Sequence, residues 1–264
     1  MLHMRRTENT VEDYSHYAKT KRKSRVPCIT INIFLINNKL NMYSQNNEDE
    51  IIFDYFKTKY PEKSGIGTMI EIGANDGKTF SNSLLFAENG WKCTLVEPSR
   101  RAFSLLEKLH LNKPNIILHN FGFGMFNGTQ TFYESGAYRD GDDVALYSSL
   151  DKDEIQKWKN DVPFVEVEAD FITWVDFRNQ NHEKYDFISI DCEGFDYNVL
   201  KSSKELLENN RIKMIKIEVL NTEDNFVNIV NLLNLHNLSL IGLTNLNYIS
   251  GELNFFDAYF QLQK

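Results

Sequence analysis

A carboxylate stands at the entrance of a glycine-containing turn in the stretch Glu71-Ile72-Gly73-Ala74-Asn75-Asp76-Gly77. Glycine permits a positive φ and lets a ligand approach the backbone closely, and asparagine tolerates the left-handed region better than most residues do. The spacing is neither that of a dinucleotide fingerprint nor that of a P-loop. Because the carboxylate of Glu71 would repel a pyrophosphate, the turn favours a cationic ligand. S-adenosylmethionine fits this description, since it has two positive centres, an adenosine and no phosphate.

A second acid, Glu97, ends another apolar run twenty residues after Gly77. In nucleotide-binding α/β folds an acid at this spacing binds the ribose hydroxyls. A strand-end acid that faces water is the alternative, and the spacing from the glycine turn favours ribose binding. Asn120 follows a third apolar run and precedes Phe121-Gly122-Phe123-Gly124. Asn120 could read the adenine edge, or this stretch could be a plain glycine-containing turn, and both interpretations stay open.

The third acidic motif is Asp191-Cys192-Glu193-Gly194, which follows the apolar run ending at Ile190. An extended backbone would place Asp191 and Glu193 on the same side. A carboxylate here could deprotonate a hydroxyl or position it for attack. A divalent metal site that adds Asp196 and a cluster stabilised by a helix start are the alternatives. We predict that Asp191 and Glu193 are the catalytic pair, and we expect no metal.

The elements that must position these residues alternate along the chain from residue 42 onward. Strands alternating with helices predict a mostly parallel α/β sheet with helices on both faces. Such sheets bind ligands beyond the carboxyl ends of their strands, where all three acidic motifs stand. Two further strands are expected at 129–133 and 164–168, and a helix after Asp151. The strands expected in the main sheet are 68–73, 92–97, 115–119, 185–191, 213–219, 238–243 and 255–262.

Charge divides the 264-residue chain into a basic arm and an acidic body. Residues 1–41 carry eight Lys/Arg against three acids, and the total of −8 leaves −13 for residues 42–264. We expect 1–41 to be a disordered extension, and the acidic body argues against a nucleic-acid partner. No apolar run approaches the roughly 20 residues of a membrane span. The three cysteines are widely spaced, which favours a reducing, cytoplasmic location.

Four motifs in order resemble the FkbM family of S-adenosylmethionine-dependent methyltransferases. They are Tyr43–Glu50, the glycine turn with Glu71, Val96-Glu97-Pro98 and Asp186–Gly194, and the similarity covers about 42–220. The resemblance implies a Rossmann-like class I methyltransferase domain over 42–264, with a seven-stranded sheet whose last strand runs antiparallel. Its usual chemistry is O-methylation of sugars or polyketide-type hydroxyls.

The resemblance also implies roles for single residues of this sequence. Asn120 would lie by the adenine, and Asp191 and Glu193 would face the acceptor. Many members carry a lysine two residues before the motif aspartate, where this chain has Ser189. The acceptor of this chain is therefore expected to differ. The remaining cofactor-binding residues would be Glu71, Gly73, Ala74, Asn75 and Gly77 around the methionine part, with Glu97 and Pro98 at the ribose.

Together these observations predict an S-adenosylmethionine-dependent methyltransferase that O-methylates a hydroxyl of a small-molecule or glycan acceptor. The acidic segment 134–161 has no secure counterpart in the family and is expected to be an insertion that acts as a substrate lid. Two alternatives remain. A nicotinamide-dependent oxidoreductase would use the same architecture, although Glu71 and the missing GxGxxG argue against it. A non-catalytic nucleotide-binding module would have kept the fold alone.

Overall fold

The computed structural model describes most of the chain from Tyr43 onward. The expected extension 1–41 and part of the expected lid lie outside the described residues, as does Thr222, which the sequence suggests as a helix cap. The described residues are 43–137, 144–208, 212–220, 225–249 and 251–263.

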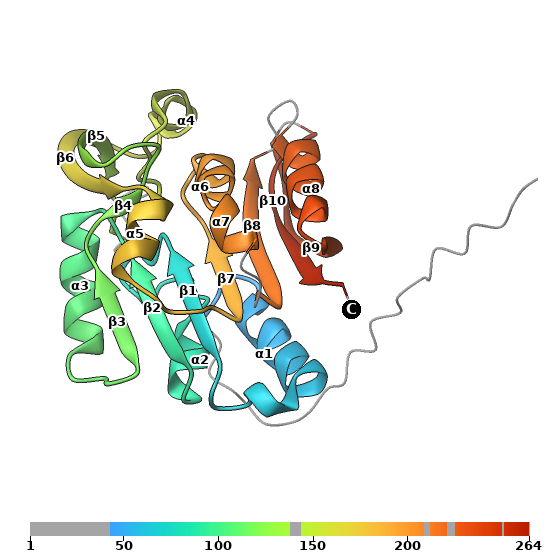
Figure 1. Ribbon diagram of the computed structural model, residues 1–264. Helices are drawn as coiled ribbons and strands as arrows, with labels where there is room; N and C mark the ends of the chain where they lie inside the picture. The colour runs from blue at the N-terminus through green and yellow to red at the C-terminus, as the bar shows by residue number, and fades with distance from the viewer. Residues whose placement is uncertain (1–42, 138–143, 209–211, 221–224, 250, 264) are drawn as a thin grey trace, which may run out of the picture. The chain divides into compact units, whose positions relative to one another are not determined.

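In the described residues, seven strands form one sheet in the order β3-β2-β1-β7-β8-β10-β9. Figure 1 shows them side by side, with β3 at the left and β9 at the right. The first five are mutually parallel, and β10 runs antiparallel to both β8 and β9. This order confirms the predicted seven-stranded class I methyltransferase sheet. Its strands are β1 (Thr68–Ile72), β2 (Lys92–Val96), β3 (Ile116–His119), β7 (Phe187–Ile190), β8 (Met214–Leu220), β9 (Leu238–Ile249) and β10 (Glu252–Leu262).

The central strands are buried along almost their whole length. Every residue of β7 and β8 is buried, and so are the last four of β1. Such runs are typical of a parallel sheet whose two faces are both covered, because neither face meets water. Strand β8 nevertheless carries charged residues at alternate positions, Lys216 and Glu218.

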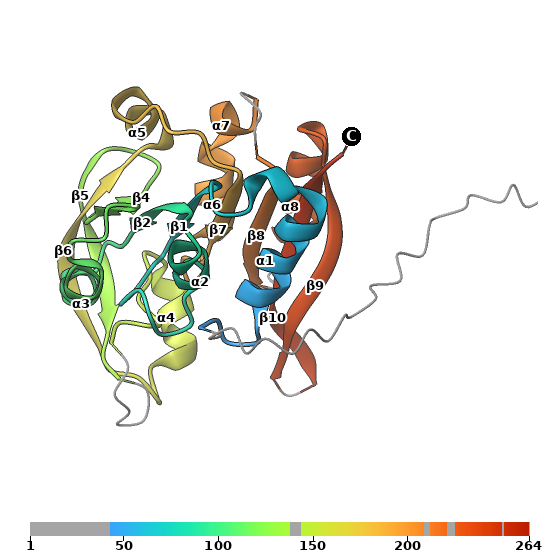
Figure 2. The ribbon, with the colours of Figure 1, turned by 90° about the horizontal axis from the view of Figure 1, so that it is seen from below.

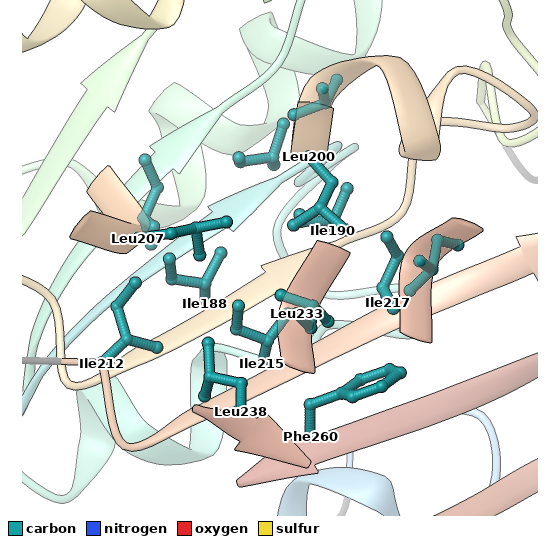
Figure 3. Close-up of a cluster of buried hydrophobic side chains, with 14 of the residues drawn as sticks. Ile188, Ile190, Leu200, Leu207, Ile212, Ile215, Ile217, Leu233, Leu238 and Phe260 are labelled. Atoms are coloured by element: carbon teal, nitrogen blue, oxygen red, sulfur yellow. The ribbon is translucent and has the colours of Figure 1, made fainter. Parts of the chain in front are cut away.

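Helices cover both faces of this sheet. One core cluster joins α1, α2 and α3 to Met69, Phe187 and Met214, and the other joins α5 to α8 to the opposite face. Figure 2 shows α5 and α7 on one side of the sheet and α2 on the other. In Figure 3, side chains of β7 and β8 meet Leu200 of α6 and Leu233 of α8. The helices are α1 (Glu48–Lys59), η1 (Pro61–Lys63), α2 (Leu84–Glu88), α3 (Arg100–His110), α4 (Lys152–Trp158), α5 (Trp174–Gln180), α6 (Asp196–Ser202), α7 (Lys204–Glu208) and α8 (Asn225–Leu235).

The N-caps of three helices can be compared with what the sequence indicates. Ser99 caps α3 by accepting a hydrogen bond from the Ala102 amide at 3.2 Å, and Asp151 caps α4, the helix predicted to follow it. Serine is a residue type that favours N-caps, and the sequence suggests Ser44 as the cap of the first helix, but Ser44 is not the N-cap of α1. Asn47 takes that position with φ 65°, while the Ser44 hydroxyl accepts from the Asp49 amide at 3.1 Å. The hydroxyl thus still satisfies a free amide of the first turn.

A separate three-stranded sheet has the order β4-β6-β5. Two of its strands, β5 (Gly128–Ser135) and β6 (Phe164–Ile172), extend the predicted 129–133 and 164–168. The third, β4 (Gly122–Phe123), lies where the sequence allowed a plain turn, so that interpretation is wrong. Gly122 permits the pairing because a Cβ there would lie 2.3 Å from the Phe171 ring.

Candidate functional site

A cavity of about 500 Å³ lies at the carboxyl ends of the parallel strands. Its lining comes from the segments that follow β1, β2 and β7, from β8, from the β9–β10 hairpin and from residues 145–158. This is the edge at which open α/β sheets bind their ligands. The predicted site residues that line it are Glu71, Gly73, Ala74, Asn75, Glu97, Pro98, Asp191 and Glu193.

We call Glu71, Gly73, Ala74, Asn75, Glu97 and Pro98 the turn wall. The turn has the predicted conformation, with φ 84° at Gly73 and 48° at Asn75. The amides of Gly73 and Ala74 donate to the Val96 carbonyl at 3.0 and 3.1 Å. A Cβ on Gly73 would lie 1.8 Å from the backbone oxygen of Asp191, so only glycine fits there.

Glu97 joins the two segments of the turn wall. One carboxylate oxygen accepts from the Asn75 amide at 2.8 Å, and the other accepts from the Ser99 amide at 2.7 Å. Burial raises the pKa of Glu97 to about 7, against the opposite effect of these two hydrogen bonds. Each oxygen keeps a free lone pair for a further donor.

Glu71 is 3% exposed and accepts from the Asn82 amide at 2.7 Å. Ser81 lies beside its second oxygen, with its hydroxyl at 3.4 Å. Burial raises the pKa of Glu71 to about 7, although the hydrogen bonds lower it. The charge of this carboxylate therefore responds to pH near neutrality, and a bound cation would favour its ionised form.

Two predicted cofactor residues do not line the cavity. Gly77 packs against α3, because a Cβ there would lie 2.3 Å from Leu106 and 2.8 Å from His110. Asn120 donates to the backbone oxygens of Glu97 and Pro98 at 2.9 and 3.3 Å. Its own oxygen accepts from Arg100 at 2.9 Å. Both ends of the Asn120 amide are thus engaged in holding the start of α3, and the cavity lining gives no support to the expected adenine contact.

Asp191 and Glu193 both line the cavity, but the backbone conformation that places them there differs from the expected one. Strand β7 ends at Ile190, and Glu193 has φ 47°. The backbone is therefore not extended, and the alternation argument for a shared side does not apply. The Asp191 amide still donates to Ile72 at 3.0 Å, which holds the motif against the end of β1.

A buried lysine, absent from the sequence predictions, lies beside these acids. Lys216 of β8 is 3% exposed, and its ammonium is 2.8 Å from Asp257 and 3.6 Å from Asp191. Burial alone would lower the pKa of Lys216, but the Asp257 and Asp191 carboxylates raise it well above its ordinary value. In the sheet register Lys216 pairs with Ser189. This chain therefore has a cation next to the position at which many FkbM-like sequences carry a lysine.

Glu218 and Asp257 complete what we call the charged wall, which consists of Asp191, Glu193, Lys216, Glu218 and Asp257. Glu218 and Asp257 face each other in the β8–β10 register, and both are buried. Burial and the neighbouring acids Asp191 and Glu193 raise the pKa of Glu218 well above its usual range. The sequence signal was the pair of charges at alternate positions of a strand that a parallel sheet covers on both faces.

A third part of the lining is amide and aromatic, and we call it the amide–aromatic wall. Tyr147 and Trp158 stack with ring centroids 4.6 Å apart. Asn245 of β9 donates to Gln45 at 3.2 Å. Ser149 anchors this side, since its hydroxyl donates to the Glu193 carbonyl at 2.6 Å. The wall consists of Gln45, Tyr147, Trp158, Asn245, Asn247, Tyr248, Asn254 and Phe255.

Comparison with known proteins decides the family. A sequence profile of the methyltransferase FkbM domain matches residues 71–250, which is more than half of the chain. The chain belongs to the FkbM methyltransferase family. The match includes the turn wall and all of the charged wall except Asp257, and it extends beyond the predicted limit at about residue 220 to the end of β9. A search of curated protein sequences finds no match.

Solved structures similar to this FkbM-family chain include precorrin-6y C5,15-methyltransferase from Geobacter metallireducens, with 10% identity and a TM-score of 0.44 over 81% of this chain and 87% of that one. An rRNA methylase from Streptococcus thermophilus has 13% identity and a TM-score of 0.44, covering 81% and 95%. Aeropyrum pernix fibrillarin, solved with S-adenosyl-L-methionine, has 10% identity and a TM-score of 0.42, covering 80% and 74%. At these values nothing about the acceptor of the FkbM-family chain follows.

The family assignment and the sheet order together confirm the predicted Rossmann-like class I methyltransferase fold. The roles of individual residues, the exclusion of nucleic acid and the cytoplasmic location stay predictions. In the part of this FkbM-family chain that the structure describes, no helix is long and apolar enough to cross a membrane.

Proposed function

We propose that the chain is an S-adenosylmethionine-dependent O-methyltransferase whose acceptor is a hydroxyl of a sugar or glycoconjugate. The observation that carries this proposal is that the amide–aromatic wall opens into the same cavity as Asp191 and the turn wall. Aromatic faces and carboxamides are well matched to a sugar, which has apolar C–H faces and many hydroxyls.

The turn wall is the proposed cofactor site. Glu71, Gly73, Ala74 and Asn75 would hold the methionine part, and Glu97 with Pro98 would hold the ribose. The free lone pairs of the Glu97 carboxylate support this assignment, since ribose hydroxyls are donors. The ionisable Glu71 supports a ligand with cationic centres. The position of Asn120 supports no adenine contact, and we leave that residue out of the proposal.

When bound, S-adenosylmethionine supplies a methyl group on a sulfonium that is already a good leaving group. The protein then has to align the acceptor oxygen with that methyl carbon, which converts an encounter between two molecules into a step inside one complex. As the oxygen–carbon bond forms and the carbon–sulfur bond breaks, Asp191 would accept the hydroxyl proton. Burial raises the pKa of Asp191, and Lys216, 3.6 Å away, acts against this rise and favours the ionised form that can serve as the base. Glu193 would orient the acceptor.

The described part of the segment 134–161 supports its proposed role in gripping the acceptor. Asn75 donates to the Val144 carbonyl at 2.8 Å, and Ser149 donates to Glu193. The segment therefore connects the turn wall with the charged wall. Exchange of 144–161 with the segment that connects the equivalents of β5 and β6 in another family member should change the acceptor, and an unchanged acceptor preference contradicts this role.

Titration calorimetry tests the cofactor part of the proposal. We expect S-adenosylhomocysteine to bind with micromolar affinity and NAD not to bind. Binding of NAD alone would favour the nicotinamide-dependent oxidoreductase. Binding of neither ligand would leave the non-catalytic module and remove the catalytic role of Asp191.

Mass spectrometry of acceptor mixtures tests the substrate part. Glycans incubated with enzyme and S-adenosylmethionine should gain a methyl group on oxygen, and RNA incubated in the same way should not. The −13 charge of residues 42–264 supports the second expectation, since it repels phosphates. Methylated RNA with unmodified glycans contradicts the proposal.

A further inference from the structure

Glu218 has a carboxylate oxygen without a partner. The side chain lies in the middle of β8, is 7% exposed and lines the cavity. Its Oε2 atom is fully buried and takes part in no hydrogen bond in the described structure. A buried polar atom that stays unpaired is costly, so this oxygen indicates that something binds beside it.

Two further carboxylates lie within reach of the same point. Oxygen atoms of Asp191, Asp196 and Glu218 all lie within 4.8 Å of one another. Backbone amides fix the Asp196 carboxylate, since Cys192 donates to one oxygen at 2.7 Å and Gly194 donates to the other at 3.1 Å. Each oxygen retains a second lone pair, so this anchoring leaves Asp196 able to bind a ligand.

Cationic side chains do not neutralise this group of three acids. Lys216 pairs with Asp257 and lies 3.6 Å from Asp191. Within the described residues, no lysine, arginine or histidine forms an ion pair with Asp196 or Glu218. When ionised, the three acids therefore carry more negative charge than the one nearby lysine compensates.

We propose that Asp191, Asp196 and Glu218 bind a divalent magnesium ion at the edge of the cavity, which Asp191 and Glu218 line. Carboxylate oxygens are the ligands that hard divalent cations prefer. Opposite ligands of an octahedral Mg²⁺ are about 4.2 Å apart, so oxygens that lie within 4.8 Å of one another can share one ion after shifts of about 0.6 Å or less. The expectation of no metal is thereby revised, and the site differs from the sequence alternative because Glu218 takes the place of Glu193.

The site has a consequence for catalysis that rests on the proposed function. A magnesium ion bound to Asp191 would lie at the same wall as the acceptor hydroxyl. A divalent ion lowers the pKa of a hydroxyl bound to it, which assists its deprotonation. The binding of the ion itself does not depend on methyl transfer and is tested separately.

Mn²⁺ serves as a paramagnetic probe for Mg²⁺, and the full chain is titrated with it while free Mn²⁺ is followed by electron paramagnetic resonance. We expect one saturable ion per chain that Mg²⁺ displaces. Glu218→Gln and Asp196→Asn should each weaken the affinity about tenfold or more, because each removes a charged ligand. Glu154→Gln is the matched control. Glu154 is a buried acid of the same cavity with its own partner, Lys157, so this variant should bind Mn²⁺ as the wild type does.

Absence of saturable Mn²⁺ binding to the wild type overturns the metal site, and so does an affinity that Glu218→Gln and Asp196→Asn leave unchanged. Thermal unfolding of each variant verifies that a lost affinity is not lost folding. Calorimetry with S-adenosylhomocysteine on the same preparation separates the two proposals. If the protein binds S-adenosylhomocysteine but not Mn²⁺, the metal site alone is overturned. If it binds Mn²⁺ but not S-adenosylhomocysteine, the cofactor proposal alone is overturned.

Discussion

The turn wall and the charged wall are both acidic and buried, yet they satisfy their polar atoms in different ways. In the turn wall, Glu97 accepts from two backbone amides and Glu71 from one. In the charged wall, Lys216 is the cation nearest to Asp191 and Asp257, and Glu218 keeps an unpaired oxygen. The carboxylates of the turn wall therefore have hydrogen-bond partners within the protein, whereas one carboxylate oxygen of the charged wall has none among the described residues.

This difference separates two tasks. Carboxylates held by backbone amides keep their geometry because the chain itself provides their partners, which suits a site that binds one cofactor. Buried acids that share one lysine are sensitive to any charge added near them, which suits the site where a proton must leave. Substitutions in the two walls should therefore affect different quantities.

The largest expected effect is on turnover. Asp191→Asn should lower kcat by about 10²–10⁴-fold, because the variant lacks the proposed base. The affinity for S-adenosylhomocysteine should stay within about twofold, since Asp191 belongs to the charged wall. Methyl-transfer kinetics and calorimetry measure the two quantities. Equal loss of both would remove the distinction between the walls.

The next effect is on stability. Lys216→Met should lower the free energy of unfolding by about 3 kcal/mol, because it leaves the buried Asp257 without its cation. Lys157→Met is the matched control. It breaks a partly exposed pair with Glu154 and should cost less than about 1 kcal/mol. Urea unfolding measures the free energy of unfolding of both variants. Similar losses for the two would contradict the dependence of the charged wall on Lys216.

The raised pKa of Glu71, in the turn wall, leads us to expect that the free energy of unfolding depends on pH. Its folded-state pKa of about 7 lies above the unfolded value, so its contribution to stability is complete at low pH and is lost as pH rises through about 7. The loss is about 2–3 kcal/mol between about pH 5 and pH 8. Glu71→Gln should flatten this part of the curve, since an amide does not ionise. Urea unfolding across this range is the measurement, and an unchanged slope contradicts the assignment.

The smallest expected effect is on acceptor binding. Trp158→Ala should raise the acceptor KM roughly tenfold, or about 1.4 kcal/mol, because it removes one ring of the Tyr147–Trp158 pair. The S-adenosylmethionine KM should not change, because Trp158 lies outside the turn wall. A rise in the cofactor KM instead would place the cofactor against the amide–aromatic wall.

The sequence predicted the sheet well because its strands are short apolar runs between clear turn signals. The turn wall was predictable for the same reason, since Glu71 and Glu97 end strands whose edge is known from the fold class. Gly77 and Asn120 show the limit of that argument. Gly77 belongs to the turn after β1 and Asn120 directly follows β3, but Gly77 packs on α3 and Asn120 binds backbone oxygens. Position along the chain does not determine which neighbour a side chain finds.

The charged wall was predicted only in part. Asp191 and Glu193 follow a strand, whereas Lys216, Glu218 and Asp257 lie within strands and come together only through the register of β8 with β7 and β10. Spacing along one strand does not give that register. The positive φ of Glu193 was equally hidden, because a glutamate gives no sign of a left-handed backbone.

The close approach of Gly73 to the Asp191 carbonyl has a consequence for enzyme engineering. Because the backbones of the two segments are already in contact, the spacing between the turn wall and the charged wall is set by the main chain. Substituted side chains can alter which molecules enter the cavity, but they cannot reset this distance. A library intended to widen the range of acceptors should therefore keep Gly73 fixed and vary the β9–β10 hairpin. Asparagines of this hairpin line the cavity, and its two strands lie beyond β8 at the edge of the sheet.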